Sequence, residues 1–226
     1  MKSGSQKLPL LIAHRGDALH FPENTIAAFQ SAFEKGSDGI ELDIQLHNKK
    51  IIVVHNYQFD QTKTYPKLQE ILELFSSKGR IEIEIKGFDT KIFKPLKLVL
   101  DSFSRADLEL TTSEVPLAIH IKRAFPKIPL GLIFFESSFP DWMTNEIVKR
   151  KLIGWGKMAK ADRLHVPLKI LSKFGKQQLV KELHDNGFIV HSHLLNTNEQ
   201  LKELHEFASW NVDQCTFDNI ELLTKI

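Results

Sequence analysis

Short apolar runs and amphipathic segments alternate along most of the chain. Runs rich in β-branched and other apolar residues predict strands over residues 9–14, 39–46, 51–55, 80–86, 108–112, 130–135, 164–166, 188–194 and 212–217. Apolar residues at helical spacing predict helices over residues 25–35, 67–75, 91–104, 115–125, 172–186 and 198–209. Residues 141–161, which include Gly154 and Gly156, carry no pattern that favours either element.

Strands that alternate with helices predict right-handed βαβ units and an α/β fold with a parallel sheet. About eight such units fit into 226 residues, which favours a closed (β/α)8 TIM barrel. A doubly wound open sheet is the alternative, because periodicity does not decide whether a sheet closes. No change of composition marks a domain boundary. Residues 1–226 are therefore expected to form a single domain, with residues 1–6 as a loose tail.

Composition narrows the class of protein. Apolar residues make up 42% and charged residues 26% of the chain, which excludes a fibrous or disordered protein. The net charge is only +2 and the charges are scattered, so no nucleic-acid partner is expected. No apolar run reaches the roughly 18 residues of a transmembrane segment, and residues 8–13 are too few for a secretion signal. A single cysteine, Cys215, fits a reducing compartment, so the expected location is cytoplasmic.

Two predicted strands carry carboxylates on one face. Residues 40–46 alternate between apolar and polar side chains, with Glu41 and Asp43 on the polar side, and residues 81–86 repeat the pattern around Glu84. In an antiparallel sheet this side would face water, whereas in a barrel the carboxylates would point inward. Buried carboxylates need a cation, and oxygen ligands suit Mg²⁺ or Ca²⁺. The pattern alone leaves both interpretations open.

Two histidines end predicted strands. His14 closes the first strand and precedes Arg15, and His55 closes the third. The strand ends of a barrel carry its catalytic groups, and two imidazoles can serve as general acid and general base near neutral pH. Either histidine alone is more often structural or merely exposed, so the argument rests on the pair beside the carboxylates. Arg15 offers a bidentate group for a phosphate or carboxylate, or an ion pair with Glu23.

Short motifs in a fixed order span the first part of the chain. They are Ala13-His14-Arg15-Gly16, Pro22-Glu23-Asn24-Thr25, Gly39-Ile40-Glu41-Leu42-Asp43, Val53-Val54-His55, Leu68-Gln69-Glu70-Ile71-Leu72 and Ile83-Glu84-Ile85-Lys86. Weaker matches follow at Ser113, within residues 187–196, and at Val212-Asp213 with Asp218. In this order and spacing the chain resembles the glycerophosphodiester phosphodiesterase family, strongly over about the first 90 residues and weakly beyond.

The resemblance implies a TIM barrel of the phospholipase-C-like (PLC-like) phosphodiesterase type. It implies metal-dependent hydrolysis of a small-molecule phosphodiester, most simply a glycerophosphodiester to sn-glycerol 3-phosphate and an alcohol, in lipid or glycerol metabolism. The cofactor it implies is one divalent cation, Mg²⁺ or Ca²⁺, with Mn²⁺ as a further candidate. The implied roles are metal ligands for Glu41, Asp43 and Glu84, the acid/base pair for His14 and His55, and phosphate binding for Arg15 and Lys86.

The chain departs from the family pattern at several places. Gln61 stands where the family often has an arginine, and only residues 57–67 stand where it usually carries an insertion subdomain. A shorter segment there predicts an open site. His193 replaces a tryptophan and is expected to line the substrate pocket. These departures keep two alternatives open: a hydrolase for a lysophospholipid or another bulky phosphodiester, and a non-catalytic protein that binds a phosphate ester.

The last alternative is a zinc site formed by His191 and His193, which share one face of a predicted strand. Two hydrogen-bonded structural imidazoles are the favoured interpretation, since no further ligand stands nearby in the sequence. His165 is expected at the surface or in packing contacts. Cys215, among apolar neighbours, is expected to be a buried small hydrophobe rather than a nucleophile.

Overall fold

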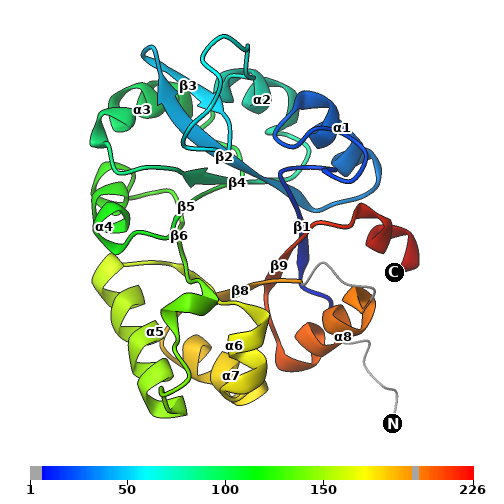
Figure 1. Cartoon of the computed structure of the whole chain (residues 1–226), viewed down its shortest axis with the longest axis vertical. Helices are drawn as coiled ribbons and strands as arrows, with labels where there is room; N and C mark the ends of the chain where they lie inside the picture. The colour runs from blue at the N-terminus through cyan, green and yellow to red at the C-terminus, as the bar shows by residue number, and fades with distance from the viewer. Residues whose placement is uncertain (1–6, 195–198) are drawn as a thin grey trace.

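A computed structural model describes residues 7–194 and 199–226. Two predictions lie outside the described residues: the tail at residues 1–6, and the motif residues Leu195 and Asn196. The strands are β1 (Leu10–His14), β2 (Gly39–His47), β3 (Lys50–Val53), β4 (Arg80–Ile85), β5 (Leu108–Thr112), β6 (Leu130–Ile133), β7 (Arg163–His165), β8 (Ile189–His193) and β9 (Gln214–Phe217). They follow the order β1-β9-β8-β7-β6-β5-β4-β2-β3, and β1 also pairs with β2 (Figure 1). All pairs are parallel except β2–β3. The sheet is therefore a closed parallel barrel, which confirms the barrel over the open sheet.

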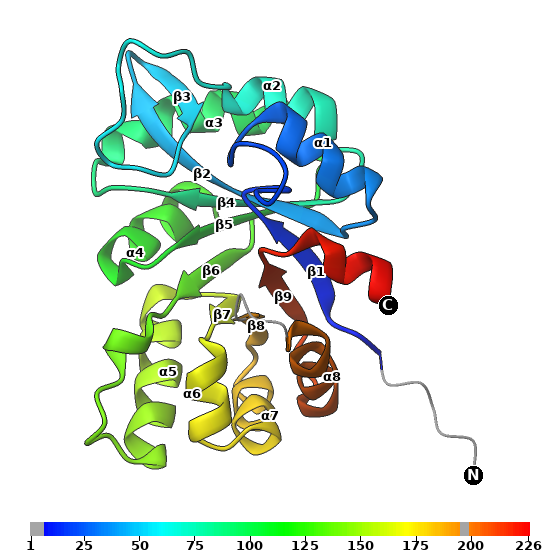
Figure 2. The ribbon, with the colours of Figure 1, turned by 45° about the vertical axis from the view of Figure 1, so that its right-hand side comes forward.

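Helices cover the outside of the barrel (Figures 1 and 2). They are α1 (Ile26–Glu34), α2 (Leu68–Phe75), α3 (Phe93–Asp101), α4 (Val115–Ala124), α5 (Asn145–Ala159), α6 (Leu168–Lys173), α7 (Gln177–Asp185) and α8 (Gln200–Trp210), with 3₁₀ turns η1 (Thr90–Ile92), η2 (Glu136–Ser138) and η3 (Ile220–Lys225). Within the described ranges, none of them has the length and apolar character that crossing a bilayer requires.

The helices of the structure differ from expectation at two places. The single helix expected over residues 172–186 is divided into α6 and α7, because Gly175 and Lys176 between them adopt φ values of +132° and +50°. Helix α5 lies within residues 141–161, the stretch whose sequence pattern favours neither helix nor strand. Its two glycines lower helix propensity, but Gly156 lies against Leu164 and Phe188, where a side chain would not fit. Tertiary packing therefore outweighs local propensity here.

The main apolar core lies between the barrel and the helices. On β2, Ile40, Leu42 and Ile44 are fully buried on the outward face, as their alternation predicts for a barrel strand. Burying each such side chain contributes about 1.5–3 kcal/mol. Because these residues point outward, the residues between them, Glu41 and Asp43, point into the barrel.

The barrel interior holds a layer of charged and amide side chains. Glu82 and Glu109 are fully buried there, and burial together with the charge of Glu109 raises the pKa of Glu82 to about 8. Glu109 Oε2 lies 3.3 Å from Arg163 Nε, and Glu109 Oε1 accepts a hydrogen bond from His165 Nε2 at 2.9 Å. The His165 ring stacks on that of His191 with centroids 3.9 Å apart. His165, expected at the surface or in packing contacts, is thus part of a buried polar layer.

Removing one charge from this layer is expected to destabilise the fold strongly. Glu109→Leu leaves the buried Arg163 guanidinium without its nearest carboxylate, which costs about 3–5 kcal/mol in the free energy of unfolding. Urea unfolding followed by circular dichroism measures this. The control is Glu73→Leu, the same change at an exposed position of α2, with an expected effect within about 0.5 kcal/mol. Equal effects of both changes would contradict the prediction.

Candidate active site at the carboxyl end of the barrel

A cavity of about 670 Å³ opens at the carboxyl ends of the strands. Asp43 lies at its base, in contact with Lys86. The structure therefore brings every predicted site residue to one place. Those that line the cavity are His14, Arg15, Glu41, His55, Glu84, Lys86 and His193.

Three carboxylates form the base of the site. Glu41 and Asp43 on β2 and Glu84 on the neighbouring β4 each direct one oxygen into a group whose members lie within 4.8 Å of one another. Glu41 and Asp43 are buried, so a water-facing role for this side of the strand is wrong. Burial, followed by the charges of Asp43 and Glu84, raises the pKa of Glu41 well above its usual range. This concentration of negative charge fits a hard divalent cation.

Two cationic side chains border the carboxylates. Lys86 Nζ lies 2.8 Å from Glu84 and 3.2 Å from Asp43, and Arg15 Nε lies 3.2 Å from Asp43. Burial acts to raise the pKa of Asp43, but Lys86 and Arg15 outweigh it and hold this pKa below the usual value. Arg15 also forms the expected ion pair with Glu23, at 2.9 Å. Both cations therefore line the cavity directly beside the carboxylate cluster.

Neighbouring polar residues position these groups. Asn24, from the loop before α1, donates a hydrogen bond to Asp43 Oδ2 at 3.0 Å. On β2, the Gln45 amide donates to the backbone carbonyl of Asn56 at 2.7 Å and thereby fixes the loop that carries His55. The polar side of β2 therefore supplies supports for the site as well as candidate ligands.

The loop after β1 depends on a glycine. Gly16 adopts a φ of +81°, and a Cβ there would lie 2.7 Å from the backbone carbon of Ala28 in α1. Gly16→Ala is expected to cost more than the roughly 1–2 kcal/mol of positive φ alone. Gly36→Ala is the matched control, because Gly36 has a φ of +95° with open space around it. Thermal unfolding of both variants separates the cost of crowding from that of backbone strain. A loss of stability in Gly16→Ala no greater than that in Gly36→Ala would contradict the crowding.

His14 faces the cavity with one ring nitrogen. Its Nδ1 donates a hydrogen bond to Asp218 Oδ1 at 2.6 Å, and its Nε2 lies 3.9 Å from Glu41 Oε2. Burial lowers the pKa of His14 more than the bond to Asp218 raises it. His55, expected to close a barrel strand, lies two residues beyond the antiparallel β3, with Nδ1 3.2 Å from the side-chain oxygen of Asn56. The two imidazoles are therefore in different environments.

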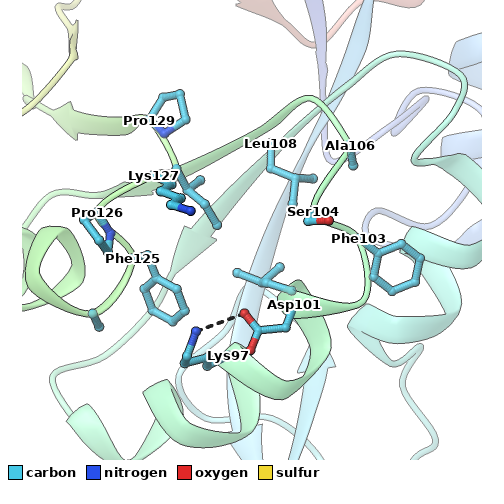
Figure 3. Close-up of a pocket in the computed structure, with 13 residues that line it drawn as sticks. Lys97, Asp101, Phe103, Ser104, Ala106, Leu108, Phe125, Pro126, Lys127 and Pro129 are labelled. Atoms are coloured by element: carbon cyan, nitrogen blue, oxygen red, sulfur yellow. Dashed lines mark hydrogen bonds and ion pairs between the residues drawn. The ribbon is translucent and has the colours of Figure 1, made fainter.

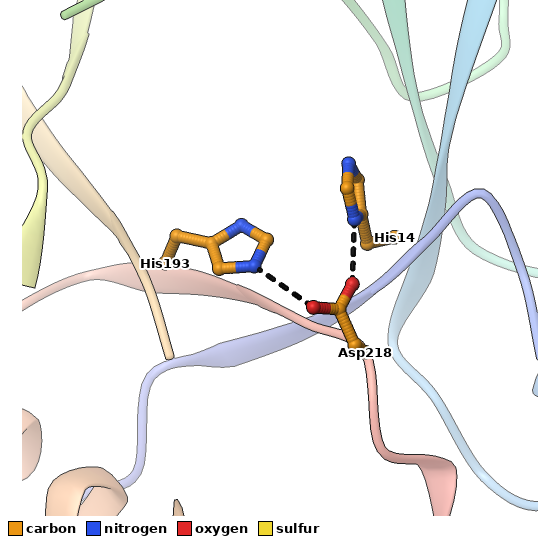
Figure 4. A group of neighbouring side chains, drawn as sticks. All are labelled: His14, His193 and Asp218. Carbon is orange, nitrogen blue, oxygen red and sulfur yellow. Dashed lines mark hydrogen bonds and ion pairs between the residues drawn. The ribbon is translucent and has the colours of Figure 1, made fainter. Parts of the chain in front are cut away.

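Asp218, just beyond β9, is a site residue that the sequence left without a role. Its two oxygens contact His14 and His193, the latter at 3.5 Å from Nε2 (Figure 4). Burial acts to raise the pKa of Asp218, but these two histidines hold it well below the usual range. In the sequence, Asp218 is marked only by a weak match to the family motifs. Its partner His14 stands 204 positions away, so only the closed barrel brings them together.

The other histidine pair has a structural role in part. His191 Nδ1 accepts a hydrogen bond from the Gln214 amide at 2.9 Å, and its Nε2 bonds the Thr216 hydroxyl. His193 turns toward Asp218 instead. The interpretation as a buried, hydrogen-bonded structural imidazole is confirmed for His191 only, because the side chain of His193 is partly exposed in the cavity. The two histidines belong to different groups of possible metal ligands, so a zinc site formed by His191 with His193 gains no support.

The far wall of the cavity is apolar. Phe134 and Phe135 after β6, and Val166 and Leu168 after β7, line this side. The segment 57–67 is short and returns to the barrel where the Val53 N–H bonds the Pro66 carbonyl at 2.8 Å. The cavity therefore combines a charged base with several apolar side chains on this wall, and the short segment 57–67 adds no subdomain over its edge.

A second cavity, of about 460 Å³, lies at the opposite end of the barrel (Figure 3). Apolar side chains such as Phe103, Leu108 and Phe125 dominate it, and Lys97 pairs with Asp101 at its edge. Barrel enzymes carry their chemistry at the carboxyl end of the strands, so this cavity is not the candidate active site.

Comparisons with known proteins agree with this description. The model of the "Glycerophosphoryl diester phosphodiesterase family" matches residues 14–63. A glycerophosphodiester phosphodiesterase of Caldanaerobacter subterraneus subsp. tengcongensis is 30% identical over 179 residues, covering 59% of this chain and 70% of that protein. The crystal structure of such an enzyme from Thermotoga maritima has a TM-score of 0.73 at 21% identity and covers 97% of this chain and 98% of that one. An Oleispira antarctica phosphodiesterase in complex with sn-glycerol-3-phosphate has a TM-score of 0.77 at 18% identity, with 96% of each chain covered.

Proposed function

Because this chain belongs to the glycerophosphodiester phosphodiesterase family and is a phosphoric diester hydrolase, we propose that it converts a glycerophosphodiester to sn-glycerol 3-phosphate and an alcohol. The observation that carries the proposal is the convergence at one cavity of the carboxylates of Glu41, Asp43 and Glu84 with Arg15, Lys86, His14 and His55. The complexed Oleispira phosphodiesterase, similar in fold, supports a small phosphate ester as the ligand.

We propose that Glu41, Asp43 and Glu84 hold one divalent cation, Mg²⁺ or Ca²⁺, with Mn²⁺ as a further candidate. Their oxygens lie within 4.8 Å of one another, and oxygen-only donors favour hard cations. When bound, such an ion would supply positive charge that stabilises the phosphoryl oxygens. Arg15 and Lys86 would bind the same oxygens and neutralise the charge that grows on them in the transition state.

The two histidines would move the protons. The bond to Asp218 keeps the proton of neutral His14 on Nδ1, so that Nε2 presents a lone pair to the site. One imidazole would take a proton from the attacking water, or from a neighbouring substrate hydroxyl that forms a cyclic phosphate for water to open. The other would give a proton to the leaving alkoxide. Asp218 would act as a positioning residue through His14 rather than on the substrate.

Asp218→Asn is expected to lower kcat by about 10- to 100-fold, a part of the roughly 10²–10⁴ contributed by acid/base catalysis. The carboxylate also favours the protonated form of His14, so its loss lowers the pKa of His14 further. Whichever limb of the pH–rate profile belongs to His14 should therefore move to lower pH. Rates measured from pH 5 to 9 test this. A lower rate with an unmoved profile would reduce Asp218 to a structural role.

The first test is hydrolysis by purified protein. The substrates are glycerophosphocholine, glycerophosphoethanolamine, a lysophospholipid and a chromogenic diester, each with EDTA and with added Mg²⁺, Ca²⁺ or Mn²⁺. Metal-dependent release of the alcohol from the two glycerophosphodiesters supports the proposal. Turnover of the lysophospholipid alone favours the bulky-diester alternative, which the apolar wall of Phe134, Phe135 and Leu168 supports. Binding without turnover of any substrate favours the non-catalytic alternative.

We also propose that residues 1–226 act as one domain and that the enzyme works in the cytoplasm, in lipid or glycerol metabolism. The closed barrel, built from strands at both ends of the described chain, supports the single domain. The lone cysteine supports a reducing compartment. Burial raises the pKa of the Cys215 thiol, which agrees with a packing role.

A further inference from the structure

Beside the carboxylate cluster, a second group of side chains has the composition of a metal site. His14 on β1, His193 on β8 and Asp218 after β9 direct ligand atoms to within 4.8 Å of one another (Figure 4). The two imidazole rings meet edge to face with centroids 5.0 Å apart. Asp218 lies between them, with its oxygens 2.6 Å from His14 Nδ1 and 3.5 Å from His193 Nε2.

From this geometry we propose that His14, His193 and Asp218 bind a transition-metal ion, Zn²⁺ by preference, and that this second site inhibits the enzyme. The inhibition rests on the proposed function, since it requires His14 to be an acid or base. The binding does not rest on it.

The donor set distinguishes this site from the carboxylate cluster. Imidazole nitrogens suit Zn²⁺ and its neighbours in the first transition row, whereas Mg²⁺ and Ca²⁺ prefer oxygen. Two histidines, one carboxylate and a water complete a tetrahedral zinc site. Zinc bonds of about 2.0–2.1 Å place tetrahedral ligand atoms roughly 3.3 Å apart. One ligand atom from each of the three residues lies within 4.8 Å of the other two, so modest side-chain shifts would bring them to this spacing.

The site is open to solvent. The side chains of His14, Asp218 and His193 are 25%, 29% and 41% exposed, and both histidines line the main cavity. An ion can therefore enter without any opening of the barrel. Asp218 supplies one negative charge, while Arg15, whose charge acts on His14, is paired with Asp43 and Glu23.

Inhibition follows from the position of one proton. With Asp218 as partner, neutral His14 carries its proton on Nδ1 and a lone pair on Nε2. A metal bound at Nδ1 moves that proton to Nε2. Neutral His14 then has no lone pair with which to accept a proton from the reacting group, and it can no longer become an imidazolium to donate one. No bond in the substrate is involved, so the effect is independent of the diester used.

The binding test uses untagged full-length protein with saturating Mg²⁺ and added Co²⁺, which reports coordination by its visible absorption. The visible absorption bands of tetrahedral Co²⁺ are expected with one equivalent of Co²⁺, and Zn²⁺ is expected to abolish them by displacing the cobalt. His193→Gln should weaken Zn²⁺ binding by at least about 10-fold. His205→Gln, a surface change on α8, and Glu84→Gln, in the carboxylate cluster, should leave the bands in place. Bands that survive His193→Gln, or that disappear in Glu84→Gln, would overturn the site.

The activity test titrates Zn²⁺ at saturating Mg²⁺. The concentration for half inhibition is expected to follow the measured binding constant and to rise in His193→Gln by the same factor. Zinc that binds at this site without inhibiting an active enzyme would overturn the inhibitory role alone. Should the protein hydrolyse none of the diesters, the proposed function fails, and the Co²⁺ spectra still decide the metal site.

Discussion

His14→Ala is expected to lower kcat for glycerophosphodiester hydrolysis by about 100- to 10,000-fold, the range of general acid/base catalysis. His14 is one of the two histidines proposed as the acid/base pair, and its Nε2 lies next to the carboxylate cluster, 3.9 Å from Glu41. Removal of the ring leaves the phosphate and metal groups in place, so KM should change far less than kcat. Initial rates at saturating metal measure both quantities.

Folding and specificity controls accompany this measurement. His205→Ala removes an exposed imidazole from α8 and should keep full activity. Circular dichroism and thermal unfolding of His14→Ala establish that the barrel is intact. His55→Ala, at the rim, should show a loss of similar order. Full activity in both His14→Ala and His55→Ala would eliminate the proposed acid/base pair.

Glu84→Gln is expected to weaken binding of the catalytic cation by at least about 100-fold, because affinity for hard cations depends on ligand charge. Activity at limiting Mg²⁺ or Ca²⁺ should fall by the same factor and recover in part at high metal concentration. Metal titration of the rate measures this shift. Glutamine is nearly isosteric with glutamate, so Glu84→Gln removes only the negative charge and the ion pair with Lys86 at 2.8 Å.

The matched control is Glu136→Gln, which changes another carboxylate of the same cavity. Glu136 is exposed and pairs with Lys169 at 3.0 Å, away from the proposed cation. The activity of the Glu136→Gln variant should depend on metal concentration as that of the unmodified enzyme does. If neither EDTA nor Glu84→Gln lowers the activity, the predicted metal requirement is wrong and the carboxylates have another function.

The part of the site on β1, β2 and β4 could be predicted because local rules fix it. A strand alternates faces with a period of two, so Glu41 and Asp43 must share a side. Sequential units of a barrel lie side by side, so Glu84 must be near them. Asp218 could not be found in this way. Its role depends on the contact between β1 and β9, which the closure of the barrel creates.

The polar layer inside the barrel was not predicted for the same reason. Glu109, Arg163 and His191 stand on three different strands, β5, β7 and β8, each of which mixes apolar and polar residues. Nothing in any one strand requires a partner of opposite charge. Only the ring of strands places Glu109 within 3.3 Å of Arg163. Long-range electrostatic pairing of this kind lies beyond any local sequence pattern.

This layer also affects how the stability of the protein changes with temperature. Unfolding exposes apolar surface, which raises the heat capacity, and polar surface, which lowers it. Unfolding exposes the buried side chains of Glu82, Glu109 and Arg163 to water. A barrel with an aliphatic interior would expose hydrocarbon instead. The heat-capacity change of unfolding should therefore fall below the roughly 3 kcal/mol/K typical of 226 residues. A smaller change flattens the curve of free energy against temperature, so that cold and heat unfolding lie farther apart for a given maximum stability.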